Sequence, residues 1–205
     1  CPNTDGCPTQ IMGKLVHFIS RKAMNVLAGD ATIEQLYRLG LVQTPADFYS
    51  LTREDLLRLD GWKDRSAERF LASLEASKST PFEQVLFALG IRYVGETTAR
   101  SVARHFGNID AIMAADRQTL LSVDDIGDVI ADSLLAYFAE PAHLREIERL
   151  RAAGLKFSMD EGAGTSVSSA LAGKTIVISM AGRTAVLSAE RHRSCWPEAS
   201  RDRRR

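Results

Sequence analysis

The sequence predicts a mainly α-helical protein built from tandem helix-hairpin-helix repeats. Helical periodicity is the first sign. After Gly95, apolar residues stand at offsets of four, seven, eight and eleven, which form one stripe of an α-helix. Repetition is the second sign, because the same offsets follow Gly127, 32 residues later, and Lys63, 32 residues earlier. With a fainter copy after Gly29, we predict four units, three of them clear.

The N-terminal ten residues, CPNTDGCPTQ, are rich in turn formers and contain Cys1 and Cys7. Two closely spaced thiolates in a loop can occupy two corners of a tetrahedral zinc site, so we predict half of a zinc knuckle. The alternative is a pair of ordinary cytosolic thiols, because Cys195 and the four histidines are not spaced as further ligands. Residues 11–27 then show a helical pattern that leads into the first hairpin.

Turn-forming and helix-capping residues divide the middle of the chain into segments. Thr52 with Asp55 predicts a helix start, and Asp60-Gly61 predicts a turn. A nucleotidyl-transfer enzyme that forms a lysine adduct would place a lysine before this Asp-Gly, but the sequence has Arg58, whose guanidinium stays protonated. Residues 77–81 predict a short linker, residues 108–115 a connecting helix, and residues 141–154 a further helix.

The C-terminal part changes in character after residue 157. Residues 158–170 are small and polar, as in a linker, and residues 171–179, LAGKTIVIS, predict a β-strand. From residue 183 onward there are seven arginines without a clear period. A basic nucleic-acid-binding tail is one interpretation. We favour a disordered or out-of-register end, because the strand needs partners that the remaining residues do not obviously supply.

Composition and charge bound the function. The 205 residues are 45% hydrophobic and 25% charged, which is ordinary for a globular protein. No apolar run approaches the roughly 20 residues that span a bilayer, so we expect a soluble cytoplasmic protein. Because the chain begins on Cys1 rather than on Met, we expect a fragment.

Net charge alone does not favour nucleic-acid binding. Lys+Arg against Asp+Glu is 10 against 10 in residues 1–80, 8 against 12 in residues 81–160, and 8 against 4 in residues 161–205. The helical body is therefore neutral to slightly acidic. Any binding to nucleic acid must come from local geometry.

The hairpins can supply that geometry. A tight glycine turn that feeds a helix leaves backbone N–H groups unpaired beside the positive end of the helix dipole, and glycine lets a phosphate approach closely. Such contacts ignore base identity, so we expect a sequence-independent grip on a DNA backbone. The alternative is a purely structural bundle. The candidate contacts are Gly61, Lys63, Arg65, Gly90, Arg92, Gly95, Thr97, Thr98, Arg100 and Gly127.

The four hairpins are not expected to be equivalent. In the fourth, Asp125 takes the first-glycine position, with Asp124 and Asp128 beside it, and three carboxylates would repel phosphate. We expect that hairpin to serve packing. In the third, Arg92 and Tyr93 predict a turn two residues longer than the others, which makes it the best candidate for DNA contact.

Several stretches resemble the C-terminal half of the bacterial NAD-dependent DNA ligases. CPNTDGCPTQ is similar to the second half of their four-cysteine zinc finger, and HFISRKAMN to the segment that follows it. ALGIRYVGETTA resembles their third hairpin, and LAGKTIVIS the first strand of their BRCT domain. The resemblance covers about residues 1–179. It ends at Met180, and the first hairpin, Ala28-Gly29-Asp30, lacks the family's Gly-x-Gly turn.

This resemblance implies a division into four parts: residues 1–27 as half zinc finger and connecting helix, 28–157 as a helix-hairpin-helix DNA-binding domain, 158–170 as a linker, and 171–205 as an incomplete α/β BRCT-like start with an aberrant basic tail. The implied role is to hold nicked duplex DNA, as a monomer near the bacterial nucleoid. Adenylation with NAD and magnesium belongs to an N-terminal domain outside this chain. No catalytic residue is therefore expected here, and the isolated fragment is expected to be inactive.

Two other classes of function stay open at this point. A repair glycosylase or nuclease would need its own catalytic group, for which Asp110 or Asp116 is the nearest candidate, but neither has a lysine partner placed for base removal. A helical protein-interaction module would suit the acidic fourth hairpin.

Overall fold

A computed structural model of the chain describes residues 7–159, 176–180 and 183–187. The chain divides into two units, residues 1–160 and residues 161–205, and each is considered by itself. The described part of the first unit consists of helices joined by turns, so the mainly α fold class is confirmed. Its elements are α1 Pro8–Ile19, α2 Asp30–Arg38, the 3₁₀ helix η1 Pro45–Ser50, α3 Arg53–Leu57, α4 Asp64–Ser77, α5 Phe82–Ala88, α6 Glu96–Phe106, α7 Ile109–Ala114, α8 Arg117–Leu121, α9 Asp128–Ala139 and α10 Pro141–Ala152.

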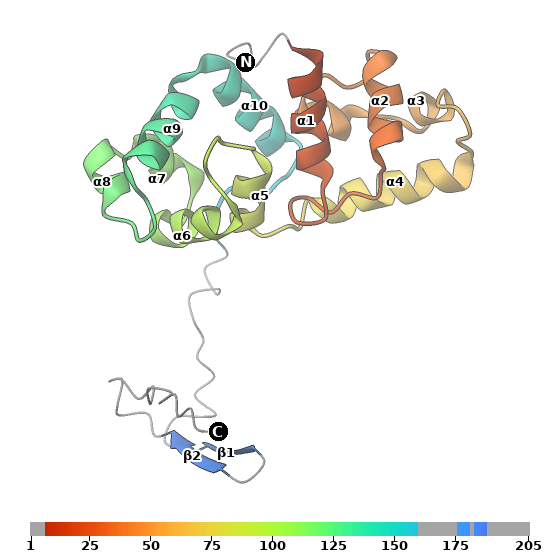
Figure 1. Cartoon of the computed structure of the whole chain (residues 1–205). Coiled ribbons are helices and arrows are strands. Elements are labelled where there is room, and N and C mark those ends of the chain that lie inside the picture. Colours follow the sequence, from red (N-terminus) through yellow and green to blue (C-terminus); the bar gives the residue numbers. More distant parts are fainter. Residues whose placement is uncertain (1–6, 160–175, 181–182, 188–205) are drawn as a thin grey trace, which may run out of the picture. The chain divides into compact units, whose positions relative to one another are not determined.

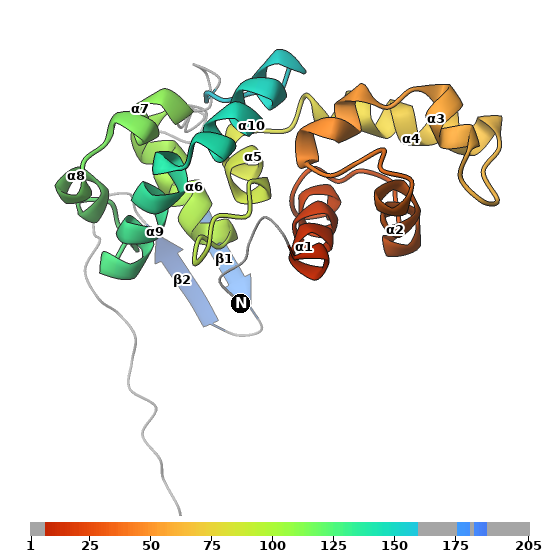
Figure 2. The same ribbon diagram turned by 90° about the horizontal axis from the view of Figure 1, so that it is seen from above.

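The helices of the first unit form two neighbouring groups, α1 to α4 and α5 to α10 (Figures 1 and 2). Four consecutive pairs are the predicted hairpin units: α1–α2, α3–α4, α5–α6 and α8–α9. Helix α1 joins the groups because it packs against both α2 and α5. Its His17 Nε2 lies 2.9 Å from the carbonyl oxygen of Phe87, and the two rings meet edge to face at 4.7 Å.

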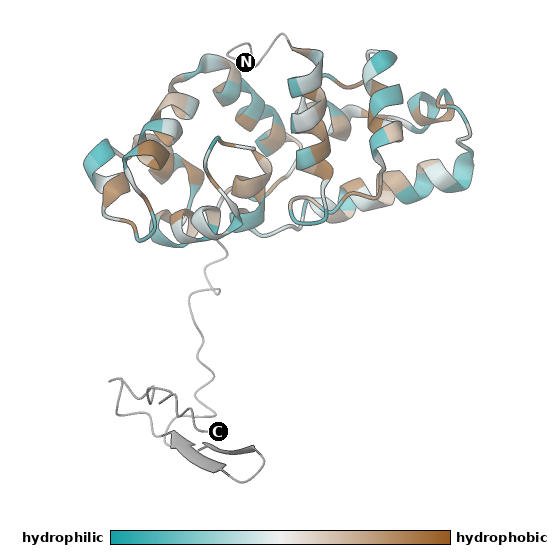
Figure 3. Ribbon diagram, viewed as in Figure 1, coloured by the Kyte–Doolittle hydropathy of each residue, from teal (hydrophilic) through white to brown (hydrophobic). Residues whose placement is uncertain are grey.

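The hydrophobic stripe predicted from the repeat is buried. Ala67, Ala99 and Ala131 occupy the same position of three units and are each 0% exposed. A residue this small lets the two helices of a pair approach closely. Hydrophilic residues lie away from this core, at the outer ends of α4 and α8 (Figure 3).

An ion pair fastens α10 to η1. Arg149 Nη2 donates to Asp47 Oδ1 at 2.7 Å, and the backbone N–H groups of Gln43 and Thr44 donate to the second carboxylate oxygen. Burial alone would raise the pKa of Asp47, but the hydrogen bonds from Arg149, Gln43 and Thr44 outweigh it and lower that pKa below its usual value. The carboxylate therefore stays charged and holds the last helix against the first group.

The second unit contributes two paired strands, β1 Ile176–Met180 and β2 Arg183–Leu187. They pair antiparallel, with Met180 opposite Arg183. The expectation that residues 171–179 form a strand without a partner is therefore wrong. Residues 183–187 include the β-branched Thr184 and Val186, and a two-residue connection is the length that joins strands in a hairpin. The start predicted for the strand, residues 171–175, lies outside the described residues, and the BRCT-like assignment stays a prediction.

Within the described ranges, no helix is both long and apolar enough to cross a membrane.

Candidate nucleic-acid interface

Three of the four hairpins contain the same four-residue turn, repeated at a period of 32 residues. In each, the amide of the fourth residue donates to the carbonyl of the first: Trp62 to Leu59 at 3.2 Å, Val94 to Ile91 at 3.1 Å, and Ile126 to Val123 at 3.2 Å. The first residue is buried in all three. The third residue has positive φ, the requirement of a type II β-turn; these residues are Gly61 (78°), Tyr93 (65°) and Asp125 (68°).

The third hairpin is longer than its neighbours, but by less than predicted. Six residues, 58–63, separate α3 from α4, and six, 122–127, separate α8 from α9. Seven, 89–95, separate α5 from α6. The predicted difference of two residues is therefore wrong, because Arg92 and Tyr93 have counterparts in the other turns. The additional residue accompanies Gly90, which ends α5 with φ 68°.

The second helix of every hairpin begins without a side-chain cap. Gly29, Lys63, Gly95 and Gly127 are the N-cap residues of α2, α4, α6 and α9, and none accepts a side-chain hydrogen bond from the first turn. By contrast, Thr52, Asn108 and Asp116 cap α3, α7 and α8 with their side-chain oxygens. Uncapped first turns keep their N–H groups available to an external acceptor.

The glycines of the site are of two kinds. Gly61 and Gly90 have positive φ, so their backbone favours glycine. Gly95 and Gly127 have ordinary φ angles of −84° and −98°, and a Cβ atom added at either would meet nothing within 4 Å. The fold does not require glycine at these two N-caps. Because glycine has no side chain, a ligand has room to approach the helix start at these two positions.

An acidic residue follows each of these N-caps, although only Asp128 was identified from the sequence as a charge that repels phosphate. They are Asp30, Asp64, Glu96 and Asp128, and a carboxylate in the first turn stabilises the helix dipole. A carboxylate also repels phosphate, so its neutralisation matters. Two of the four are neutralised in the same way by the arginine that begins the preceding helix; the pairs are Arg53 with Asp64 and Arg117 with Asp128.

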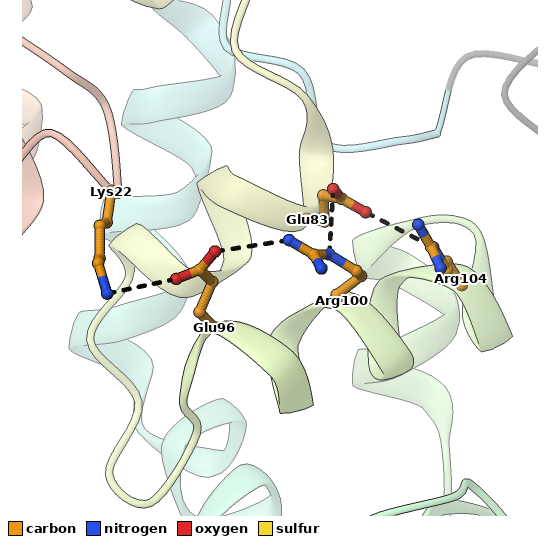
Figure 4. Close-up of polar contacts among 5 residues, drawn as sticks. All are labelled: Lys22, Glu83, Glu96, Arg100 and Arg104. Carbon is orange, nitrogen blue, oxygen red and sulfur yellow. Dashed lines mark hydrogen bonds and ion pairs between the residues drawn. The ribbon is translucent and has the colours of Figure 1, made fainter. Parts of the chain in front are cut away.

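In the third hairpin a chain of alternating charges replaces that pair (Figure 4). Glu96 contacts Lys22 from the first hairpin at 3.7 Å and Arg100 at 3.5 Å. Arg100 also contacts Glu83, which in turn contacts Arg104 at 3.7 Å. Arg100 thus lies between two carboxylates, which weakens it as a phosphate contact.

The remaining predicted contacts differ in accessibility. Lys63, Arg65, Arg92 and Thr97 are exposed, as are the four candidate glycines. Thr98 is only 8% exposed, because the helical period places it beside the buried Ala99. Its side chain is buried, which leaves the backbone amide as the group of Thr98 at the helix start.

The most informative difference among the basic residues is whether they have a carboxylate partner. Most of those in the described part of the chain pair with a carboxylate. Six make no such ion pair, and five of these lie in the first three hairpins or the helix starts that follow them. Paired and unpaired basic residues cannot be told apart from the sequence, because pairing depends on tertiary neighbours. The six are Arg21, Lys63, Arg65, Arg69, Arg92 and Arg145.

The fourth hairpin has the opposite character. Asp124 and Asp125 are exposed at its tip. Arg117 nearby is engaged by Asp132 at 2.8 Å and by Asp128 at 2.6 Å, and these two carboxylates raise its pKa. The tip of this hairpin therefore presents negative charge without a free cation.

Neither predicted zinc ligand can be assigned to a site. Cys7 is the N-cap of α1 and a half-buried free thiol, and Cys1 lies outside the described residues. In the described ranges, no three His, Cys, Asp or Glu side chains are grouped to hold a metal ion.

Comparison with known proteins agrees with this geometry. The family described as helix-hairpin-helix motif matches residues 84–147, which run from α5 into α10. The repeated turns and uncapped helix starts thus belong to a helix-hairpin-helix domain.

Proteins that are similar over most of the chain give a more specific comparison. The chain is 47% identical over 179 residues to a DNA ligase of Parabacteroides distasonis, 48% over 180 residues to one of Phocaeicola vulgatus, and 46% over 180 residues to one of Flavobacterium psychrophilum. Each alignment covers 87% of this chain and 27% of the relative. The resemblance to the DNA ligases is confirmed, and the chain spans about a quarter of the length of these relatives.

Proposed function

We propose that this chain is the part of an NAD-dependent DNA ligase that holds nicked duplex DNA by its sugar-phosphate backbone. The observation that carries the proposal is the position of the unpaired cations. Arg21, Arg92 and the group Lys63, Arg65 and Arg69 lie on the first three hairpins, beside helix starts that have no side-chain cap. Cations and open N–H groups together are what phosphate oxygens bind.

This arrangement resolves the problem of the neutral net charge. Ion pairs cancel most of the positive charge elsewhere in the helical body, so the remaining positive charge is concentrated on three hairpins. Backbone N–H groups and flexible cations contact phosphates without reading bases, so binding is independent of sequence and falls with salt.

The chain supplies grip rather than chemistry. Adenylation with NAD and magnesium takes place in another part of the ligase, and Cys1 and Cys7 complete a zinc finger with ligands outside this chain. The protein acts as a monomer in the bacterial cytoplasm, on the nucleoid. A glycosylase or nuclease role is disfavoured, because Asp110 pairs with Arg151 and Asp116 caps α8.

A matched pair of substitutions tests the proposal. Gly95→Val and Gly127→Val place the same side chain at equivalent N-caps, and both positions have open space and ordinary φ. We expect Gly95→Val to weaken the binding of a nicked duplex about tenfold, because the side chain obstructs phosphate approach, a loss of about 1.4 kcal/mol. Gly127→Val is expected to leave the affinity unchanged, since the fourth hairpin repels phosphate.

Affinity should be measured by fluorescence anisotropy at two salt concentrations, with circular dichroism to confirm that both variants are folded. Failure of the wild-type chain to bind duplex at low salt contradicts the proposal. Equal affinities of the two folded variants contradict the assignment to the third hairpin. Strand cleavage or base release by the wild-type chain would instead support the repair-enzyme alternative.

A further inference from the structure

A basic groove runs from the third hairpin along the junction of α1 and α10. It consists of two adjoining cavities of about 380 Å³ and 260 Å³. Both are lined by Lys14 of α1 and His143 of α10, so the two cavities share a wall. Gly90 and Arg92 line the smaller cavity, which places one end of the groove at the third hairpin. We call this feature the α1–α10 groove.

The lining of the groove is positive although the surrounding chain is not. Its lining has four cations, Lys14, Arg92, Arg145 and Arg149, and one carboxylate, Glu146; a second carboxylate, Asp47, pairs with Arg149. Residues 81–160 as a whole carry more acidic than basic side chains. Arg92 and Arg145 belong to the six cations without a carboxylate partner, and one of them lies in each cavity. Positive charge is therefore concentrated in a hollow, where it attracts anions more strongly than on a flat surface.

Several contacts fix the walls of the groove. The ring of His143 stacks on that of Tyr137 at 4.0 Å, and its Nδ1 lies 3.0 Å from the carbonyl oxygen of Tyr137. Ser133 Oγ donates to the carbonyl oxygen of Arg92 at 2.7 Å, which ties the third hairpin to α9. Binding of a ligand to such a pre-formed site costs little further ordering.

We propose that the α1–α10 groove binds the phosphodiester backbone of a nucleic-acid strand that continues beyond the third hairpin. This inference rests on the proposed function. Two observations favour a phosphodiester over an acidic peptide: the groove begins at Arg92, which the hairpin site already uses, and its cations are spread over two cavities rather than clustered at one point. The groove extends the contact surface from hairpin tips to the body of the protein.

The test uses the variant Arg145→Gln, because Arg145 has no carboxylate partner. Its matched control is Arg38→Gln, which removes the same charge from a position outside both cavities. Affinity for nicked duplex is measured between about 50 and 200 mM salt. Each lost phosphate contact reduces the magnitude of the slope of log K against log salt by about 1, so we expect a decrease of about 1 for the groove variant and none for the control. Circular dichroism checks that each variant is folded.

Each outcome decides between the two proposals. An unchanged slope in the folded groove variant, while Gly95→Val still weakens binding, overturns the groove assignment and leaves the hairpin grip standing. No binding by the wild-type chain overturns both. A polyglutamate peptide of equal charge that displaces the duplex from the wild-type chain, but not from the groove variant, would show that the groove selects acidic peptides and overturns the phosphodiester assignment.

Discussion

The third and fourth hairpins share a backbone and differ in charge. Both turns join a buried first residue to a buried fourth residue, and both have a left-handed third residue. Between these anchors, the third hairpin carries Arg92 and Tyr93, and the fourth carries Asp124 and Asp125. The shape of the turn therefore depends on its two buried ends. The charge of the two middle residues can therefore vary, and it determines whether the turn attracts or repels phosphate.

Exchange of the two tips should have the largest effect. The double variant Arg92→Asp with Tyr93→Asp gives the third hairpin the tip of the fourth, and we expect roughly 100-fold weaker duplex binding at about 0.1 M salt, because one cation is lost and two negative charges are gained. The reciprocal variant, Asp124→Arg with Asp125→Tyr, should strengthen binding. Anisotropy titration with a nicked duplex measures both.

Helical content serves as the control for this exchange, since the buried turn ends are unchanged. If both exchanged chains remain folded and bind as the wild type does, the tips do not contact DNA. The charge difference between the third and fourth hairpins would then have no role in DNA binding.

The common backbone can be tested separately through stability. A left-handed conformation costs a non-glycine residue about 1–2 kcal/mol, partly offset by the greater freedom of glycine in the unfolded chain. At positions 93 and 125, the variant with glycine should therefore be more stable than the variant with alanine. The expected difference in the free energy of unfolding, measured with urea, is about 1 kcal/mol. At Arg92, whose φ is not positive, alanine should equal or exceed glycine. The opposite order at position 93 would show that the turns are not equivalent.

The smallest expected effect concerns the helices that precede the two turns. Helix α8 is capped by Asp116, whereas α5 follows Pro81 and has no side-chain cap. Hydrogen bonds from the Thr119 hydroxyl and backbone N–H lower the pKa of Asp116 below its ordinary value of 3.8. Because the folded-state pKa is depressed, the cap stabilises the protein above pH 3.8 and is lost as the pH falls through the lowered pKa.

Thr119→Val removes the hydroxyl but keeps the amide. The pKa of Asp116, followed by NMR titration of its carboxyl carbon, should rise in this variant and still remain below the ordinary value. A titration identical to that of the wild type would mean that the hydroxyl takes no part in the cap.

Features that depend on local and periodic patterns could be predicted from the sequence. The stripes after Lys63, Gly95 and Gly127 placed α4, α6 and α9, and the carboxylates of the fourth hairpin were visible at once. Properties that depend on neighbours distant in sequence were not predicted. Whether an arginine is paired, as Arg100 is, or unpaired, as Arg145 is, depends on which helices meet. The partner strand β2 was missed because Thr184 and Val186 are its only β-branched residues and it begins the arginine-rich end of the chain.

The contact between His17 and Phe87 joins two hairpin units that are far apart in the sequence. A carbonyl oxygen only accepts hydrogen bonds, so Nε2 of His17 donates to the carbonyl oxygen of Phe87. This bond and the edge-to-face contact of the two rings hold the first hairpin unit against the third. A ligand that touches both units therefore meets them at a constant spacing.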